Sequence, residues 1–260
     1  MLKDGIERAP DNADLYDTLS FLYLTAGQFP EAEENALKAV ELAPDQMWPS
    51  LLKVYSLWSA AGATQESRAI LEALPRAAGW ILWSWYWQNM MEDRYDEALL
   101  LLAEAEVDWI REKMWARPLV LYEALTRHAM GQHGQANALF EEARRLLEAE
   151  VAAFPDDPRY HSSLGLAYAG LGMAEEAVRE GERAIALLPV SEDAFYGLPY
   201  PVDLATIHAL LGDETAALDG IEYLLSIPSW FSPAWLEVDF RFDALRDHDR
   251  FRALMDAAPS

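Results

Sequence analysis

The sequence has no cysteine among its 260 residues. Disulfide bonds and thiolate metal sites are therefore excluded, and so is a cysteine nucleophile for thiol catalysis. The absence leaves the compartment open. It favours the cytoplasm, with the periplasm as the alternative.

Basic residues are also scarce. Lys and Arg total 20 against 44 Asp and Glu, which gives a formal net charge of −24. A field of this sign repels phosphate backbones and anionic lipid, so we expect no direct binding to nucleic acid. The carboxylates either solvate the outer faces of the protein or attract a partner with basic segments, and composition leaves both interpretations open.

Long apolar runs are missing as well. The chain contains no stretch of 18 apolar residues, and its start lacks the charged and apolar pattern of a secretory signal. We therefore expect no association with a membrane. Because 52% of the residues are nevertheless apolar, the chain has enough hydrophobic side chains for a substantial core.

What the sequence does contain is a repeated two-helix pattern, which is most complete at residues 158–191. Gly165 and Ala177 have little bulk at positions where two antiparallel helices would approach each other. Gly172 suits the end of the first helix, since glycine adopts a positive φ without steric cost. Pro189 suits the end of the second helix, which proline cannot continue. Residues 158–191 therefore predict a helical hairpin.

The same register recurs at residues 13–46, 48–78, 79–109, 117–155 and 198–228. Five of the six units carry glycine at position 15, and Asp93 takes its place in the third. Small residues occupy position 20 in all six units, namely Ala32, Ser67, Ala98, Ala136, Ala177 and Ala217. This spacing resembles that of tetratricopeptide repeats, with Leu164, Gly165, Tyr168, Gly172, Ala177, Ala184 and Pro189 at the matching positions of the best unit.

The resemblance implies an all-α fold, a right-handed superhelical solenoid of antiparallel helix pairs with about six repeats and a C-terminal cap. We expect a partial preceding repeat at residues 1–12, N-terminal units at 13–116, C-terminal units at 117–230 and the cap at 231–260. Pro155 stands seven residues beyond the position that the pattern predicts. The helix at about 135–153 should therefore be extended by two turns.

Three later segments, at 187–195, 223–230 and 239–254, are similar to bacterial repeat arrays that follow a signalling effector domain. In such proteins the effector is a winged-helix regulator, a serine/threonine kinase or an adenylate cyclase. The chain itself shows no phosphate-binding glycine loop, kinase signature or basic recognition helix. A regulatory segment of a larger bacterial signalling protein is thus an alternative to a free-standing scaffold.

The resemblance also implies which residues would line a concave peptide groove, namely those at positions 2, 5 and 9 of each first helix. Four of the ten tryptophans lie within residues 80–87, and three of them share one helical face. The groove candidates are Phe21, Leu24, Leu52, Trp80, Trp83, Trp87, Leu121, Tyr122, Leu125 and Leu166. Alternatively, neighbouring repeats bury these side chains, because aromatic stripes at helical spacing are usually core.

The groove candidates are apolar, so we expect a protein or peptide partner that is apolar with basic flanks. Some tetratricopeptide-repeat proteins clamp a terminal carboxylate with lysine and asparagine, but this chain has Asp17 and Phe21 at those positions. The five histidines show no metal-binding spacing, and no serine has a nucleophile-elbow context. We therefore expect no metal, no cofactor and no catalysis. An enzyme is the least favoured alternative, and the apolar end left by a partial first repeat could support a homo-oligomer.

Overall fold

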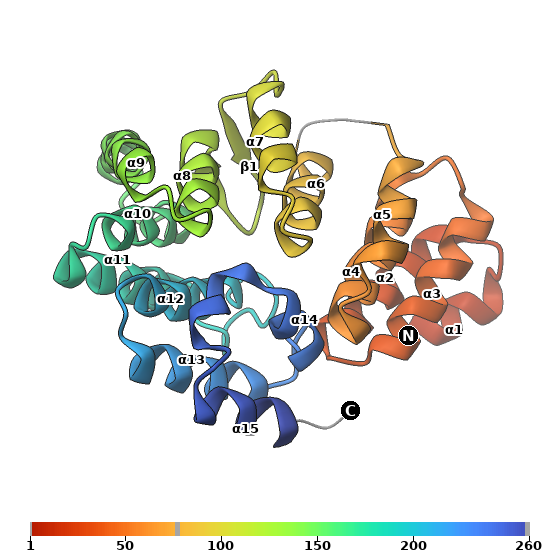
Figure 1. Cartoon of the computed structure of the whole chain (residues 1–260). Helices are drawn as coiled ribbons and strands as arrows, with labels where there is room; N and C mark the ends of the chain where they lie inside the picture. The colour runs from red at the N-terminus through yellow and green to blue at the C-terminus, as the bar shows by residue number, and fades with distance from the viewer. Residues whose placement is uncertain (1, 76–78, 258–260) are drawn as a thin grey trace. The chain divides into compact units, whose positions relative to one another are not determined.

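The structure is a computed structural model that describes residues 2–75 and 79–257 (Figure 1). Most of these residues lie in helices that follow one another as antiparallel pairs. The predicted all-α array of helix pairs is confirmed. One short hairpin, β1 (Trp109–Arg111) paired antiparallel with β2 (Ala116–Pro118), was not predicted by the repeat pattern.

The described residues form two compact units. Unit 1 contains residues 2–75 together with 228–238, and unit 2 contains residues 79–227 together with 239–257. The stretch expected to form a C-terminal cap, 231–260, therefore contributes to both units. The predicted boundaries at residues 12, 116 and 230 were placed by the repeat register, whereas the two units are defined by their internal contacts. The predicted boundaries therefore stay predictions.

Unit 1 is built from two full helix pairs and two short helices. Trp58, which is fully buried, donates a hydrogen bond from Nε1 to Ser67 Oγ at 2.8 Å and packs edge-on against Trp235. The hydroxyl of Ser232 donates to the Ser59 carbonyl, so residues 228–238 are held on the fourth helix by polar and aromatic contacts. The helices are α1 (Leu2–Arg8), α2 (Ala13–Thr25), α3 (Phe29–Leu42), α4 (Met47–Ala61), α5 (Thr64–Glu72) and α14 (Pro233–Val238).

Unit 2 contains four helix pairs, the β-hairpin and a C-terminal segment that ends in a helix. Its core centres on α10, which packs against α9, α11 and α12. The pairs are α6 (Trp80–Met91) with α7 (Tyr95–Ala103), α8 (Leu119–Ala129) with α9 (His133–Ala153), α10 (Pro158–Gly170) with α11 (Ala174–Leu187), and α12 (Pro199–Leu210) with α13 (Glu214–Ser226). The C-terminal segment holds the 3-10 helix η1 (Phe240–Leu245) and α15 (Asp249–Ala257).

The turns between paired helices confirm the predicted register. All six residues at position 15 have a left-handed backbone, including Asp93, whose φ is 56°. Tyr95 donates a hydrogen bond to the Asp93 carboxylate at 2.7 Å, which supports this non-glycine turn. The five glycines at position 15, whose φ lies between 57° and 73°, are Gly27, Gly62, Gly131, Gly172 and Gly212.

Small residues allow the paired helices to approach closely. The six side chains at position 20 are fully buried, as the register predicts. A Cβ added at Gly165 on α10 would lie 3.0 Å from the carbonyl oxygen of Ala177 on α11 and 2.7 Å from Ile207 Cδ1. Any larger residue at this position would displace the Ile207 side chain and press α10 away from α11.

The helix that precedes Pro155 is extended, as its late proline predicts. α9 has 21 residues, whereas α11 in the next pair has 14. Arg144 on α9 pairs with Glu141 at 2.5 Å and with Glu148 at 2.6 Å. Such pairs one helical turn apart support the exposed side of a long helix.

Candidate functional site

The aromatic cluster on α6 is covered by other parts of unit 2. Trp83 stacks on Trp115, which follows β1, with ring centroids 4.5 Å apart. Trp80 meets the same ring edge-on at 5.0 Å. Trp83 is 8% exposed and Trp87 is 3% exposed. Trp83 and Trp87 therefore belong to the core of unit 2, which agrees with the alternative interpretation of the stripe, whereas Trp80 is partly exposed.

The far end of the aromatic stripe contacts the C-terminal segment. The ring of Trp87 lies 5.4 Å from that of Phe240, and the guanidinium of Arg241 sits 4.6 Å from the Trp87 ring centroid. A cation over an indole face is attracted by the negative charge of the ring. The segment that follows α14 is thus bound against α6.

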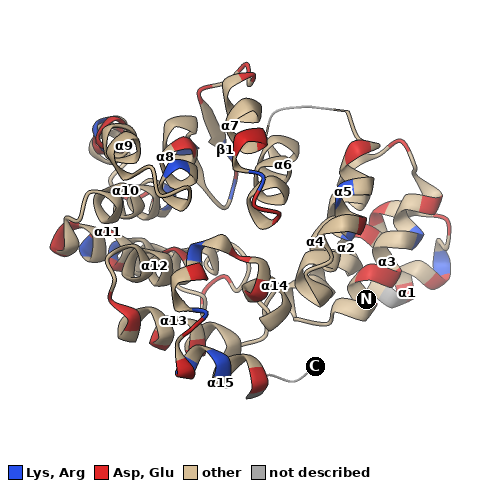
Figure 2. Ribbon diagram, viewed as in Figure 1, with Lys and Arg blue, Asp and Glu red and all other residues tan. Residues whose placement is uncertain are grey.

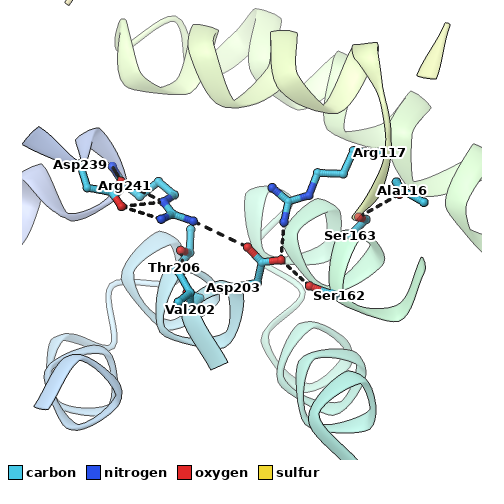
Figure 3. A network of polar contacts seen from close by, with 9 residues as sticks. All are labelled: Ala116, Arg117, Ser162, Ser163, Val202, Asp203, Thr206, Asp239 and Arg241. Atoms are coloured by element: carbon cyan, nitrogen blue, oxygen red, sulfur yellow. Dashed lines mark hydrogen bonds and ion pairs between the residues drawn. The ribbon is translucent and has the colours of Figure 1, made fainter. Parts of the chain in front are cut away.

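A buried network of charges lies beside this contact (Figure 3). Asp203, on α12, accepts hydrogen bonds from Arg117 of β2 and from the hydroxyl of Ser162 on α10. Arg241 approaches the other oxygen of Asp203 with Nη1 at 3.7 Å. It also forms a two-point pair with Asp239, with Nε at 2.8 Å from Oδ1 and Nη2 at 2.5 Å from Oδ2.

The network contains two arginines and two carboxylates, so its formal charge is zero. All four charged side chains are at most 6% exposed. Burial alone would lower the pKa of Arg117, but the charge and hydrogen bond of Asp203, together with Tyr122 and Tyr86, outweigh it, and the pKa is raised. Buried charges are tolerated when they are paired and hydrogen-bonded in this way.

Local sequence explains how these groups are positioned. α12 begins at Pro199 and is apolar except for Asp203, Thr206 and His208, so its charged side chain faces a buried surface. The Asp239 carboxylate accepts a hydrogen bond from the backbone N–H of Arg241 at 3.1 Å and so caps η1. Together, Trp87, Leu125, Ser162, Asp203 and Thr206 define what we call the inner face of unit 2.

Beside η1 the inner face leaves a small cavity of about 200 Å³. Burial lowers the pKa of His128, and the charge of His133 adds to this effect. The imidazole of His128 and the hydroxyl of Thr206 give this largely apolar cavity polar groups. Its lining comprises Leu125, His128, Ala129, Thr206, Ala209, Leu210, Phe240, Arg241, Asp243 and Ala244.

The other predicted groove residues are mostly buried. In unit 2, Leu121, Tyr122, Leu125 and Leu166 are at most 6% exposed. In unit 1, Leu24 and Leu52 are buried, while Phe21 is partly exposed and lies 6.2 Å from the Trp48 ring. The structure brings Trp87 and Leu125 to the inner face, and contact of the ten residues with a peptide stays a prediction.

The sequence analysis did not identify the charged residues of the inner face. Asp203 carries a recognisable signal, because it is the sole charge in the otherwise apolar α12. Arg241 also carries one, since it stands between Phe240 and Phe242. Arg117 lies at the boundary between two repeats and has no comparable signal.

The described residues also show what kinds of site they do not form. Within 2–75 and 79–257, no helix has both the length and the apolar character needed to cross a bilayer. The same residues contain no group of three His, Asp or Glu arranged to hold a metal ion. Acidic residues are spread over the helices of both units, with fewer basic ones among them (Figure 2).

The fold of this chain is similar to that of a solved structure. The APC/C hetero-tetramer Cut9–Hcn1 matches with a TM-score of 0.53 at 15% identity, over 100% of this chain and 45% of that chain. The chain has the fold of a tetratricopeptide-repeat solenoid. This agrees with the six left-handed turns and the buried small residues of its helix pairs.

Similarity in amino-acid sequence to known proteins covers a smaller share of this chain than the structural match does. The mitochondrial import receptor subunit TOM34 of Rattus norvegicus is 29% identical over 119 residues, which is 40% of this chain and 38% of that protein. The Mus musculus protein of the same name matches equally. The solenoid chain thus spans well under half the length of these relatives. No family model matches it, and the predicted link to a bacterial effector domain stays a prediction.

Proposed function

We propose that this solenoid is a non-catalytic scaffold that binds a protein or peptide on the inner face of unit 2. One observation supports the proposal more than any other. Two segments outside the helix pairs, β2 and η1, are both bound to Asp203 on this face, through Arg117 and Arg241. A face that binds two such segments of its own chain has the contacts needed to bind an external one.

The fold and the charge of the chain support the same function. The similar structure is a hetero-tetramer of Cut9 and Hcn1, and TOM34 is named as an import receptor subunit. A net charge of −24 favours encounter with a partner that has basic groups. The apolar cavity beside η1 adds a place for an apolar side chain of that partner.

Selection from a random peptide display library tests the proposal. Ala209→Arg places a long cationic side chain at the lining of the cavity, and it should abolish the enrichment of peptides that wild type selects. Ala138→Arg is the matched control, because Ala138 is exposed on α9 away from the cavity lining. Circular dichroism checks that both variants stay folded. Equal enrichment by all three proteins would contradict binding at the inner face.

A further inference from the structure

The inner face already holds a short segment with a distinct chemical pattern. Residues 239–245 read Asp-Phe-Arg-Phe-Asp-Ala-Leu, so an arginine stands between two phenylalanines and follows an aspartate by two positions. η1 accounts for six of these seven residues. We call this stretch the segment 239–245.

Arg241 makes the central contacts of the segment. Its guanidinium lies over the Trp87 ring at 4.6 Å and pairs with the carboxylates of Asp239 and Asp203. The side chain is only 6% exposed. The inner face thus supplies an aromatic surface and a buried carboxylate for one arginine.

The two phenylalanines on either side of Arg241 are buried with it. Phe240 is 9% exposed and contacts the Trp87 ring, and Phe242 is fully buried. Leu245 is 1% exposed at the end of the same turn. The segment is therefore bound through one cationic side chain that stands between two aromatic ones.

The shape of the segment is set within the segment itself. The Asp239 carboxylate accepts from the Arg241 backbone N–H at 3.1 Å, and the Asp239 carbonyl accepts from the Phe242 N–H at 3.2 Å. The same carboxylate holds the Arg241 guanidinium. A peptide with the pattern Asp-aromatic-Arg-aromatic could therefore adopt the same turn without the rest of the chain.

Both flanks of the segment are fixed elsewhere. Before it, Trp235 on α14 packs on Trp58 of unit 1. After it, Phe251 on α15 is buried, and the neighbouring Arg250 pairs with Asp219 of α13 at 2.6 Å. A segment held at both ends competes at an effective concentration on the order of millimolar, so an external peptide binds only by displacing it.

We infer that the inner face of unit 2 recognises partner peptides in which an arginine is flanked by aromatic residues, and that the segment 239–245 is the chain's own copy of this ligand. The inference rests on the proposed function and names its partner class. The cavity beside Phe240, Arg241 and Asp243 gives an incoming peptide access to the edge of the segment.

A labelled peptide with the sequence of residues 237–247 tests this inference by fluorescence anisotropy on the full chain. Arg241→Ala removes the central contact of the segment and should bind the peptide at least about tenfold more tightly than wild type, since the internal competitor is weakened. Arg252→Ala is the matched control, because Arg252 is an exposed arginine on α15 that pairs with Asp249, outside the segment and the cavity lining. Its affinity should equal that of wild type.

A second protein variant and a control peptide complete the experiment. Phe240→Ala weakens the segment while leaving every buried charge paired, and it replaces Arg241→Ala if that variant does not fold. A peptide with alanine in place of its central arginine should not bind any of the proteins. Failure of both folded variants to bind the arginine peptide more tightly than wild type would overturn the inference.

The display selection separates this inference from the proposed function. Enriched peptides that need the inner face but lack an arginine beside an aromatic residue would leave the function standing and overturn the inference. Enriched peptides that carry this pattern would support both. Enrichment that does not depend on the inner face would contradict the function itself.

Discussion

Asp203 connects more of unit 2 than any other residue of the inner face. It accepts from Arg117 on the strand before α8 and from Ser162 on α10, and it faces Arg241 of η1. These groups come from four separate elements, and all are shielded from water. Because a buried charge without its partner is costly, the four elements are coupled through this one carboxylate.

Replacing Asp203 by asparagine should strongly destabilise the protein. Asn keeps the shape but leaves Arg117 and Arg241 without the charge of Asp203, so we expect a loss of about 3–5 kcal/mol in the free energy of unfolding. Urea denaturation followed by circular dichroism measures it. Asp219→Asn removes a carboxylate from an exposed pair with Arg250 and should cost less than about 1 kcal/mol. Similar losses in both variants would contradict a special role for Asp203.

His161 is a second residue whose charge joins several helices. Its Nδ1 lies 2.6 Å from the Glu180 carboxylate on α11, and its Nε2 lies 2.9 Å from the carbonyl oxygen of Pro155 after α9. The hydrogen bond to Glu180 raises the pKa of His161; burial opposes this and the Pro155 carbonyl supports it. Arg183 lies close enough to oppose the positive charge weakly.

Stability should therefore fall as the pH rises through the raised pKa of His161. Its protonated form stabilises the fold fully below the unfolded value of about 6.5, and this contribution is lost at higher pH. Urea denaturation at pH 5.5 and 8.5 should show a larger decrease for wild type than for His161→Gln. His248→Gln changes an exposed histidine and should retain the wild-type difference. An equal decrease in His161→Gln would contradict the coupling.

At the scale of single elements, the turns and close contacts of the helix pairs could be read from the sequence. Position 15 requires a left-handed backbone, and glycine or a supported Asp93 marks that requirement in every unit. Position 20 requires a small side chain where helices touch. The late Pro155 likewise predicted the long α9. Each of these features depends on local backbone conformation or close helix packing. The spacing of glycine, small residues and proline in the sequence therefore predicts them.

Two glycines without neighbours test the turn register. Gly172 has a φ of 73° and no atom within 4 Å of an added Cβ, so Gly172→Ala should cost about 1 kcal/mol through its backbone alone. Gly134 is equally open but lies inside α9, and Gly134→Ala should stabilise by up to about 1 kcal/mol. Thermal unfolding monitored by circular dichroism measures both. Changes of the same sign would contradict the assignment of these two positions.

The inner face could not be predicted in the same way. Its chemistry depends on the hairpin at Trp109–Pro118 and on η1, which have no counterpart in the repeat register. Repeat spacing made Trp83 and Trp87 groove candidates, with burial as the alternative, and it carries no information about their contacts with Trp115 and Arg241. Long-range pairings between irregular segments are set by tertiary contacts rather than by local pattern.

At the scale of the whole molecule, the chain contributes residues to each unit more than once. Residues 79–227 belong to unit 2, residues 228–238 belong to unit 1, and the chain returns to unit 2 at Asp239. The segment that occupies the inner face therefore lies directly after a stretch held in the other unit. This connectivity keeps the internal ligand available in every molecule, so external binding is always a competition.

The affinity of one display-selected peptide for two matched variants tests the central claim most directly. Ala209→Arg alters the lining of the inner-face cavity, whereas Ala138→Arg adds the same side chain to an exposed position on α9. Isothermal titration should give wild-type affinity for Ala138→Arg and at least about a tenfold weaker affinity for Ala209→Arg, which corresponds to about 1.4 kcal/mol. Equal affinities in the two folded variants would contradict binding at the inner face of unit 2.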